Sequence, residues 1–108
     1  MAIRYPSPLR PGDHIGVTAP SRGIGKDLQG RLDFCMDYLC SREYDVVIGE
    51  CMRGDGLVSA PAAQCAEELT RMLTDPGIRA VVPPWGGELA VELLPHLDME
   101  AIASADPT

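Results

Sequence analysis

The stretch Pro-Gly-Asp-His-Ile-Gly-Val-Thr-Ala-Pro at residues 11–20 decides the fold class of this chain. Its first three residues are a turn signal, because proline and glycine favour the backbone angles of tight turns. Residues 14–19 are mostly apolar and partly β-branched, which is typical of a strand. Pro20 lacks the N–H group that a central strand would need to continue. The stretch therefore predicts a buried strand over residues 14–19.

Two further segments of this kind follow along the chain, at residues 44–49 (Tyr-Asp-Val-Val-Ile-Gly) and 78–82 (Ile-Arg-Ala-Val-Val). Each of the three predicted strands precedes a segment whose apolar residues recur at helical spacing. The alternation of strand and helix predicts an α/β protein with three α/β/α layers and a mostly parallel sheet. Parallel strands end at one edge of the sheet, and ligands bind at that edge in such folds.

The starts of the three helices are predicted from local signals. Asp27 is the expected N-cap of the first helix, and Pro61 suits the first turn of the second. A flexible loop is expected over residues 51–58, because this segment is rich in glycine and aspartate. Pro95 is expected to bend or shorten the third helix. The second helix is expected to face the core with a stripe of small and aliphatic side chains: Ala62, Ala66, Leu69 and Leu73.

Composition limits the classes of function. The 108 residues include 9 basic and 16 acidic side chains, giving a formal charge of −7, and 45% are hydrophobic. This predicts one domain over residues 1–108. The acidic balance argues against nucleic acid and anionic membranes as partners. No apolar run is long enough for a signal peptide or a membrane span, so we expect a cytoplasmic protein.

The cysteines and histidines do not show the spacing of a metal site. No two cysteines form a Cys-x-x-Cys pair, and neither His14 nor His96 lies near them in sequence. We therefore expect no metal and no cofactor, and we interpret the cysteines as reduced core residues. They are Cys35, Cys40, Cys51 and Cys65.

A glycine-containing loop, residues 20–25, follows the first predicted strand. It fails the dinucleotide fingerprint, because Leu28 stands where the third glycine is required. It also fails the phosphate P-loop, because Asp27 follows the Gly-Lys pair. Ser21 lies close to the strand end but has no histidine near it in sequence, which favours a turn or cap role over that of a nucleophile.

A second loop, Trp85-Gly86-Gly87-Glu88, follows the third predicted strand. Paired glycines leave backbone N–H groups uncovered, as in sites that bind a carboxylate or stabilise an oxyanion. The alternative is a tight turn that needs glycine angles. Trp85 either lines a pocket or caps the core. Other glutamates are interpreted as solvated helix faces, namely the pairs Glu67/Glu68 and Glu88/Glu92.

Several blocks of this sequence resemble one family in order and spacing. They are residues 6–21, the Gly-Leu-Val-Ser-Ala stretch at 56–60 with Ala66-Glu67-Glu68-Leu69 after it, residues 75–82, and residues 83–98. Together they resemble the N-terminal domain of the serine LD-carboxypeptidases, which include muramoyltetrapeptide carboxypeptidase and the microcin C self-immunity proteins. The Pro-Pro-Trp-Gly-Gly-Glu form at 83–88 is more similar to the microcin-immunity branch. The resemblance implies a flavodoxin-like fold of the class I glutamine amidotransferase type.

The resemblance also implies an activity. The family cleaves amide bonds with a serine, a glutamate and a histidine, and none of these three carries over to a residue of this chain. Their serine follows the block that matches residues 93–102, so the chain alone is expected to be inactive. Gly86 and Gly87 are the implied backbone donors of an oxyanion hole, and Trp85, Glu88 and Ser21 are the substrate-binding candidates. The expected partners are a murein peptide or aminoacyl-nucleotide substrate, the family's C-terminal domain, and a second copy of the chain.

Two alternative hypotheses about the function, from other classes of protein, remain open. One is a non-catalytic peptide-binding or interaction module with the same fold. The other is an unrelated flavodoxin-like nucleotide binder, which the failed fingerprints disfavour.

Overall fold

The computed structural model describes residues 3–20, 23–52, 61–84 and 88–108, and side chains in the last range from residue 90. Its three strands are β1 (His14–Val17), β2 (Asp45–Ile48) and β3 (Ile78–Val82). The α-helices are α1 (Gln29–Ser41), α2 (Ala62–Thr74) and α3 (Met99–Ser104). Three 3-10 helices accompany them: η1 (Lys26–Leu28), η2 (Glu50–Met52) and η3 (Glu88–His96).

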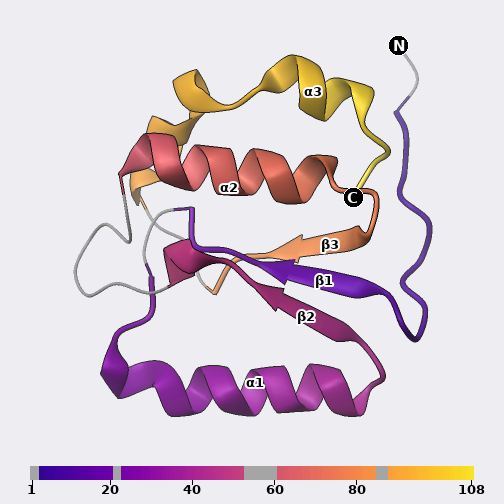
Figure 1. Cartoon of the computed structure of the whole chain (residues 1–108), viewed down its shortest axis with the longest axis vertical. Helices are drawn as coiled ribbons and strands as arrows, with labels where there is room; N and C mark the ends of the chain where they lie inside the picture. Colours follow the sequence, from indigo (N-terminus) through magenta and orange to yellow (C-terminus); the bar gives the residue numbers. More distant parts are fainter. Residues whose placement is uncertain (1–2, 21–22, 53–60, 85–87) are drawn as a thin grey trace.

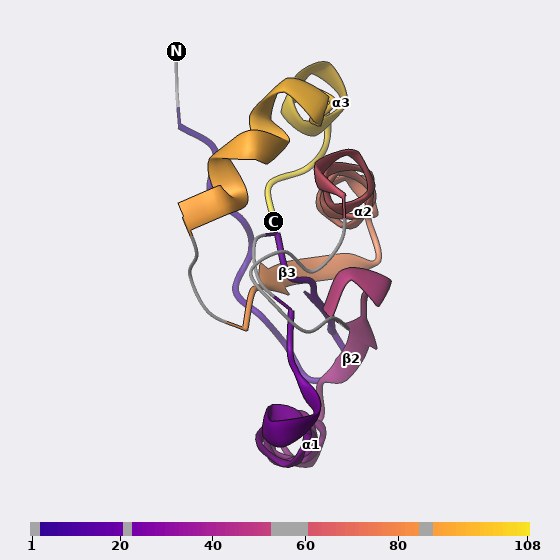
Figure 2. The same cartoon turned by 90° about the vertical axis from the view of Figure 1, so that its left-hand side faces the viewer.

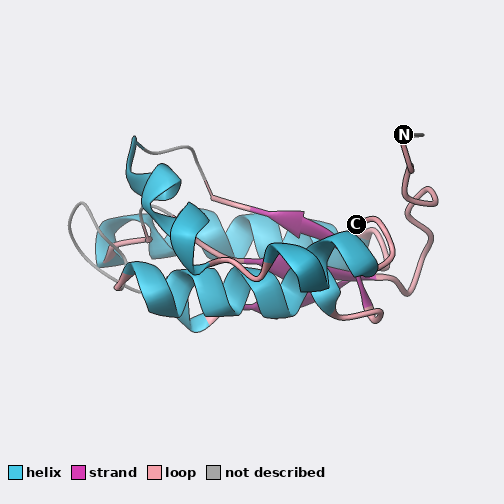
Figure 3. Ribbon diagram, turned by 90° about the horizontal axis from the view of Figure 1, so that it is seen from above, coloured by secondary structure: helices cyan, strands magenta, loops and turns pink. Residues whose placement is uncertain are grey.

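The strands form a parallel sheet in the order β2-β1-β3, so the first strand is the central one (Figure 1). Helices lie on both sides of the sheet, as the alternating pattern predicted (Figure 2). α1 contacts β2, α2 contacts β3, and η3 and α3 pack on α2. The helices run alongside the strands rather than across them (Figure 3). The predicted α/β fold class is confirmed.

The two faces of β1 serve two different cores. Ile15 and Val17 point toward α1 and form a buried cluster with Ala19 and Met52. Gly16 faces α2, where an added Cβ would lie 2.9 Å from Met72 Sδ. The missing side chain at Gly16 thus lets α2 approach the sheet closely.

Element boundaries differ modestly from those predicted. β1 ends at Val17 rather than at residue 19, although Thr18 and Ala19 are buried. β2 spans 45–48 rather than 44–49, and β3 matches the prediction. The expectation of a flexible loop from residue 51 was wrong at its start, because Cys51 and Met52 belong to η2 and are buried. Residues 53–58 of that loop lie outside the described residues.

Two helix predictions were also wrong in detail. Asp27 does not cap the first helix, because it lies inside η1, and Leu28 is the N-cap of α1. The third predicted helix is the 3-10 helix η3, which ends one residue after Pro95, and α3 is a separate helix that was not predicted. The Asp98 side chain caps α3 by accepting a hydrogen bond from Ala101 N at 3.0 Å.

α2 buries more than the predicted stripe. Its buried residues are Cys65, Ala66, Glu68 and Met72, while Ala62, Leu69 and Leu73 are partly exposed. The helix lies between the sheet and η3, so it needs two buried sides. Ala66 and Cys65 pack with Leu93 of η3, whereas Met72 faces the sheet.

Candidate functional site

The parallel strands bring their carboxyl ends to one edge of the sheet, on the left in Figure 1. The loops that leave this edge contain the sequence-predicted site residues. Ser21, Trp85, Gly86 and Gly87 lie outside the described residues, and Glu88 is described only as the first backbone position of η3. Their roles stay predictions. The residues that the structure describes next to these loops are those at the carboxyl ends of the strands.

Glu68 is the main polar feature at this edge. It lies on α2 and is only 4% exposed. Its carboxylate accepts a hydrogen bond from the Thr18 hydroxyl. It also accepts the Cys51 backbone N–H, which lies 3.3 Å from both carboxylate oxygens. One side chain of α2 thus holds the residues that follow β1 and β2.

Gly49 completes the surroundings of this carboxylate. A Cβ atom added to Gly49 would collide with the carboxyl group of Glu68. Glycine at the end of β2 thus leaves room for the buried acid, because a side chain here would have to displace the Glu68 carboxyl group. The interpretation of Glu68 as a solvated residue was wrong, whereas its neighbour Glu67 is exposed as expected, and so is Glu92.

Backbone hydrogen bonds connect the same residues to the third strand. Thr18 N donates to Val82 O at 3.4 Å, and Gly49 N donates to Val17 O at 2.8 Å. Val82 directly precedes Pro83 and Pro84, which lead into the Trp-Gly-Gly segment. Backbone hydrogen bonds of Val17 and Thr18 therefore connect the end of β1 to the ends of β2 and β3.

Two cysteine thiols lie beside this cluster. Cys51 and Cys65 are buried and reduced, as expected for core residues, but Cys35 and Cys40 are exposed on α1. The core interpretation was wrong for the latter two, because α1 has no fully buried residue. Burial raises the pKa of the Cys51 thiol far above its ordinary value, and a hydrogen bond with Cys65 and the charge of Glu68 act in the same direction. Cys51 is therefore a protonated, unreactive thiol at neutral pH.

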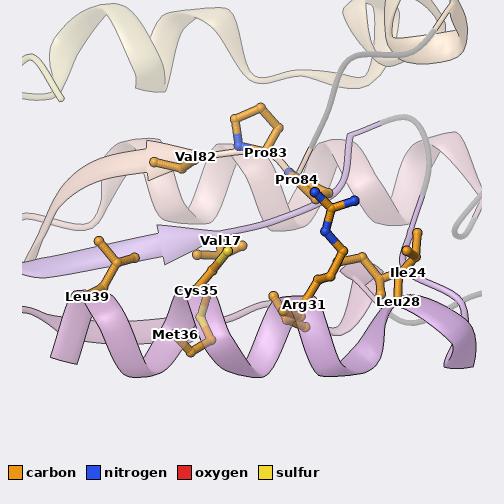
Figure 4. Close-up of a pocket in the computed structure, with 11 residues that line it drawn as sticks. Val17, Ile24, Leu28, Arg31, Cys35, Met36, Leu39, Val82, Pro83 and Pro84 are labelled. Atoms are coloured by element: carbon orange, nitrogen blue, oxygen red, sulfur yellow. The ribbon is translucent and has the colours of Figure 1, made fainter. Parts of the chain in front are cut away.

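An apolar cavity of about 300 Å³ lies between α1 and the sheet (Figure 4). Val17 and Val82 form its floor, and Pro83 and Pro84 border it near the loop after β3. Arg31 from α1 extends toward these prolines. The cavity thus adjoins the same edge as Glu68, on the opposite face of the sheet.

In the described residues no group of three or more histidine, cysteine, aspartate or glutamate side chains is arranged to hold a metal ion. His14 pairs with Asp45 at 3.2 Å at the amino ends of β1 and β2, away from the candidate edge. None of the helices in the described part of the chain is long and apolar enough to cross a membrane.

Sequence reasoning missed Glu68 and Thr18. Glu68 follows another glutamate in a helix, so its residue type gave no sign of burial. Thr18 gave a weak signal, because a hydroxyl in an apolar segment needs a hydrogen-bond partner when it is buried. The identity of that partner depends on how α2 is rotated against the sheet.

Comparison with known proteins identifies the family. Residues 15–108 match the LD-carboxypeptidase N-terminal domain. The chain belongs to the LD-carboxypeptidase family. A protein of Vibrio cholerae that is described as an inferred carboxypeptidase is 32% identical to the chain over 104 residues, which are 95% of this chain and 31% of that protein.

Solved structures of this family share the fold. The microcin C7 self immunity protein MccF superposes with a TM-score of 0.84 at 26% identity, over 93% of this chain and 30% of MccF. Muramoyltetrapeptide carboxypeptidase from Oxalobacter formigenes superposes with a TM-score of 0.68 at 26% identity, over 83% of this chain and 29% of that protein. The chain thus spans less than a third of the length of the family members it matches.

Proposed function

We propose that this chain is the N-terminal part of a serine amide hydrolase of the LD-carboxypeptidase family. In this proposal it forms the scaffold, one wall of the substrate site and the backbone donors of the oxyanion hole, Gly86 and Gly87. Trp85, Glu88 and Ser21 contact the substrate. The observation that carries the proposal is the family match over residues 15–108, which includes all of these positions.

The remaining parts of the reaction are assigned to the region of the relatives that this chain does not match. A serine there attacks the amide carbonyl, an acyl-enzyme forms, and water releases the product. The backbone N–H groups of Gly86 and Gly87 would stabilise the negative oxygen of the tetrahedral intermediate. The cytoplasmic location expected from the sequence belongs to this proposal and is tested by cell fractionation.

Two substrate classes fit the family, a murein tetrapeptide and an aminoacyl nucleotide. The higher TM-score with MccF and the Pro-Pro-Trp-Gly-Gly-Glu segment favour the aminoacyl nucleotide. MccF has been solved with aspartyl sulfamoyl adenosine, which is a suitable probe of this class.

The proposal is tested by separating binding from turnover. The purified chain should bind aspartyl sulfamoyl adenosine, with shifts of the Gly86 and Gly87 amide signals in a ¹⁵N-¹H spectrum, and should bind an L,D-tetrapeptide more weakly. It should release no product from either compound, as followed by mass spectrometry. Turnover by the chain alone would show that catalytic groups are present in these 108 residues, contrary to the proposal.

Proline substitutions sharpen the test, because proline has no backbone N–H. Gly86→Pro and Gly87→Pro should each weaken binding, while Gly30→Ala, on the exposed surface of α1, should not. Equal affinity in all three variants would remove the glycine pair from the site. Binding that depends on the glycines, together with no hydrolysis after addition of the rest of a family enzyme, would instead support the non-catalytic binding module.

A further inference from the structure

Glu68 is buried at a position where an apolar side chain would cost less free energy to remove from water. Removing a carboxylate from water is unfavourable, and buried charges are weak evidence for a purely stabilising role. Glu67, one residue earlier on the same helix, is exposed. The two adjacent glutamates therefore differ in surroundings and not in chemistry.

The contacts of Glu68 are directed at the carboxyl edge of the sheet. The Thr18 hydroxyl comes from the residue directly after β1, and the Cys51 N–H comes from η2, which only Gly49 separates from β2. Both described partners donate to the same carboxylate, so it fixes the distance between the two departing segments. Gly49 leaves the space that this carboxylate needs.

The third strand is included through Thr18. Its backbone N–H donates to Val82 O, so the residue held by Glu68 also contacts the last residue of β3. In open parallel sheets, ligands bind outside the carboxyl ends of the strands. If these strand ends shift relative to one another, the position of every loop that follows them changes as well.

We propose that Glu68 is a positioning residue of the ligand site. Its carboxylate holds the ends of β1 and β2, and through Thr18 the end of β3, in the arrangement that binds the aminoacyl-nucleotide ligand. Glu68 acts through Thr18 and the Cys51 N–H rather than by touching the ligand. The ligand part of this inference depends on the function proposed above.

The first arm of the test needs no ligand. Glu68→Gln replaces one carboxylate oxygen with an NH₂ group and removes the charge, so a single neutral oxygen remains as the acceptor and the hydrogen bond from the Cys51 N–H weakens. The Cys51 amide proton signal should move upfield, and exchange of the Cys51 and Thr18 amides should accelerate about tenfold relative to global unfolding. The matched control Glu67→Gln should change neither. Unchanged Cys51 exchange in Glu68→Gln would overturn the positioning role.

The second arm uses the Thr18 hydroxyl and the ligand probe. Thr18→Val removes the hydroxyl at nearly constant volume and should weaken aspartyl sulfamoyl adenosine binding about tenfold, as should Glu68→Gln. Thr18→Ser keeps the hydroxyl and should restore the affinity. Equal affinity in Thr18→Val and Thr18→Ser, with both proteins folded, would refute the inference even if Glu68→Gln fails to fold.

The two proposals fail in different ways. If the wild-type chain does not bind the probe, the proposed function fails, and the exchange measurement still decides whether Glu68 fixes the strand ends. If the wild-type chain binds the probe and Glu68→Gln binds equally well, the function stands and the positioning role is wrong.

Discussion

Glu68 and Gly49 depend on each other, because the backbone of one provides the space for the carboxylate of the other. Such a pair restricts substitution at both positions. An added methyl group at Gly49 must displace Glu68 from its two partners or push β2 away from α2. Overpacking of this kind usually destabilises a protein.

We predict that Gly49→Ala lowers the free energy of unfolding by about 1–3 kcal/mol. Gly30→Ala is the matched control, because nothing lies within 4 Å of an added Cβ there and alanine favours helix. It should raise the free energy of unfolding by up to about 1 kcal/mol. Urea denaturation measures both, and a neutral Gly49→Ala would contradict the described position of Glu68.

A second residue-scale prediction concerns Cys51 at alkaline pH. Its pKa is raised in the folded state from an ordinary value of 9.0, so above that pH the unfolded chain loses a proton that the folded chain keeps. Stability must then fall as pH rises. Between pH 8 and pH 10 the difference in unfolding free energy between wild type and Cys51→Ser should shrink by about 1.4 kcal/mol. A constant difference over this range would show that the thiol titrates normally in the folded protein.

At the scale of elements, the strands could be predicted well and the helices less so. Short apolar runs bounded by proline and glycine specify the strands at 14–17 and 78–82 almost alone. The orientation of α2 could not be predicted, because it depends on how α2 packs against η3, a contact that the sequence pattern does not specify. Without that partner, nothing distinguishes Glu68 from Glu67.

Helix capping shows the same limit. Asp27 and Asp98 each precede an apolar helical pattern, and only Asp98 makes the capping hydrogen bond. The difference arises because η1 already continues into α1, so Asp27 is inside a turn rather than at its start. For the candidate site, the sequence and its family resemblance predict loop residues, and those roles stay predictions, while the contacts of Glu68 depend on tertiary packing.

We predict that Asp98→Ala destabilises the protein by about 1 kcal/mol, because α3 loses its N-cap. Asp27→Ala should change stability by less than about 0.5 kcal/mol, as for an ordinary surface residue. Thermal unfolding monitored by circular dichroism compares the two variants. A larger effect at Asp27 would mean that the first helix begins with the cap expected from the sequence.

The described part of the molecule leaves several apolar side chains of the sheet and of α1 exposed. α1 contacts β2 and α2 contacts β3, so β3 borders the apolar cavity on one face, and Val47 and Ile48 of β2 are exposed. α1 adds Phe34 and Tyr38, which are 74% and 56% exposed. An edge strand with apolar side chains favours pairing with another chain.

We predict that the chain self-associates through the β2 edge at high concentration. Added salt should strengthen association, because it screens the repulsion between copies carrying a charge of −7. Ile48→Lys should shift the equilibrium to monomer in sedimentation velocity experiments, whereas Val91→Lys, on η3, should not. A wild-type chain that stays monomeric at high salt would contradict this prediction.

Because β1 is the central strand, both strands that pair with it are synthesised after it. Its second neighbour, β3, ends at Val82, so the strand translated first remains half-paired until more than three quarters of these residues have been made. For most of that interval Thr18 also lacks Glu68, whose carboxylate accepts a hydrogen bond from the Thr18 hydroxyl. Pairings between distant segments form slowly. A chaperone would therefore protect the nascent chain most during the period before Glu68 and β3 have been synthesised.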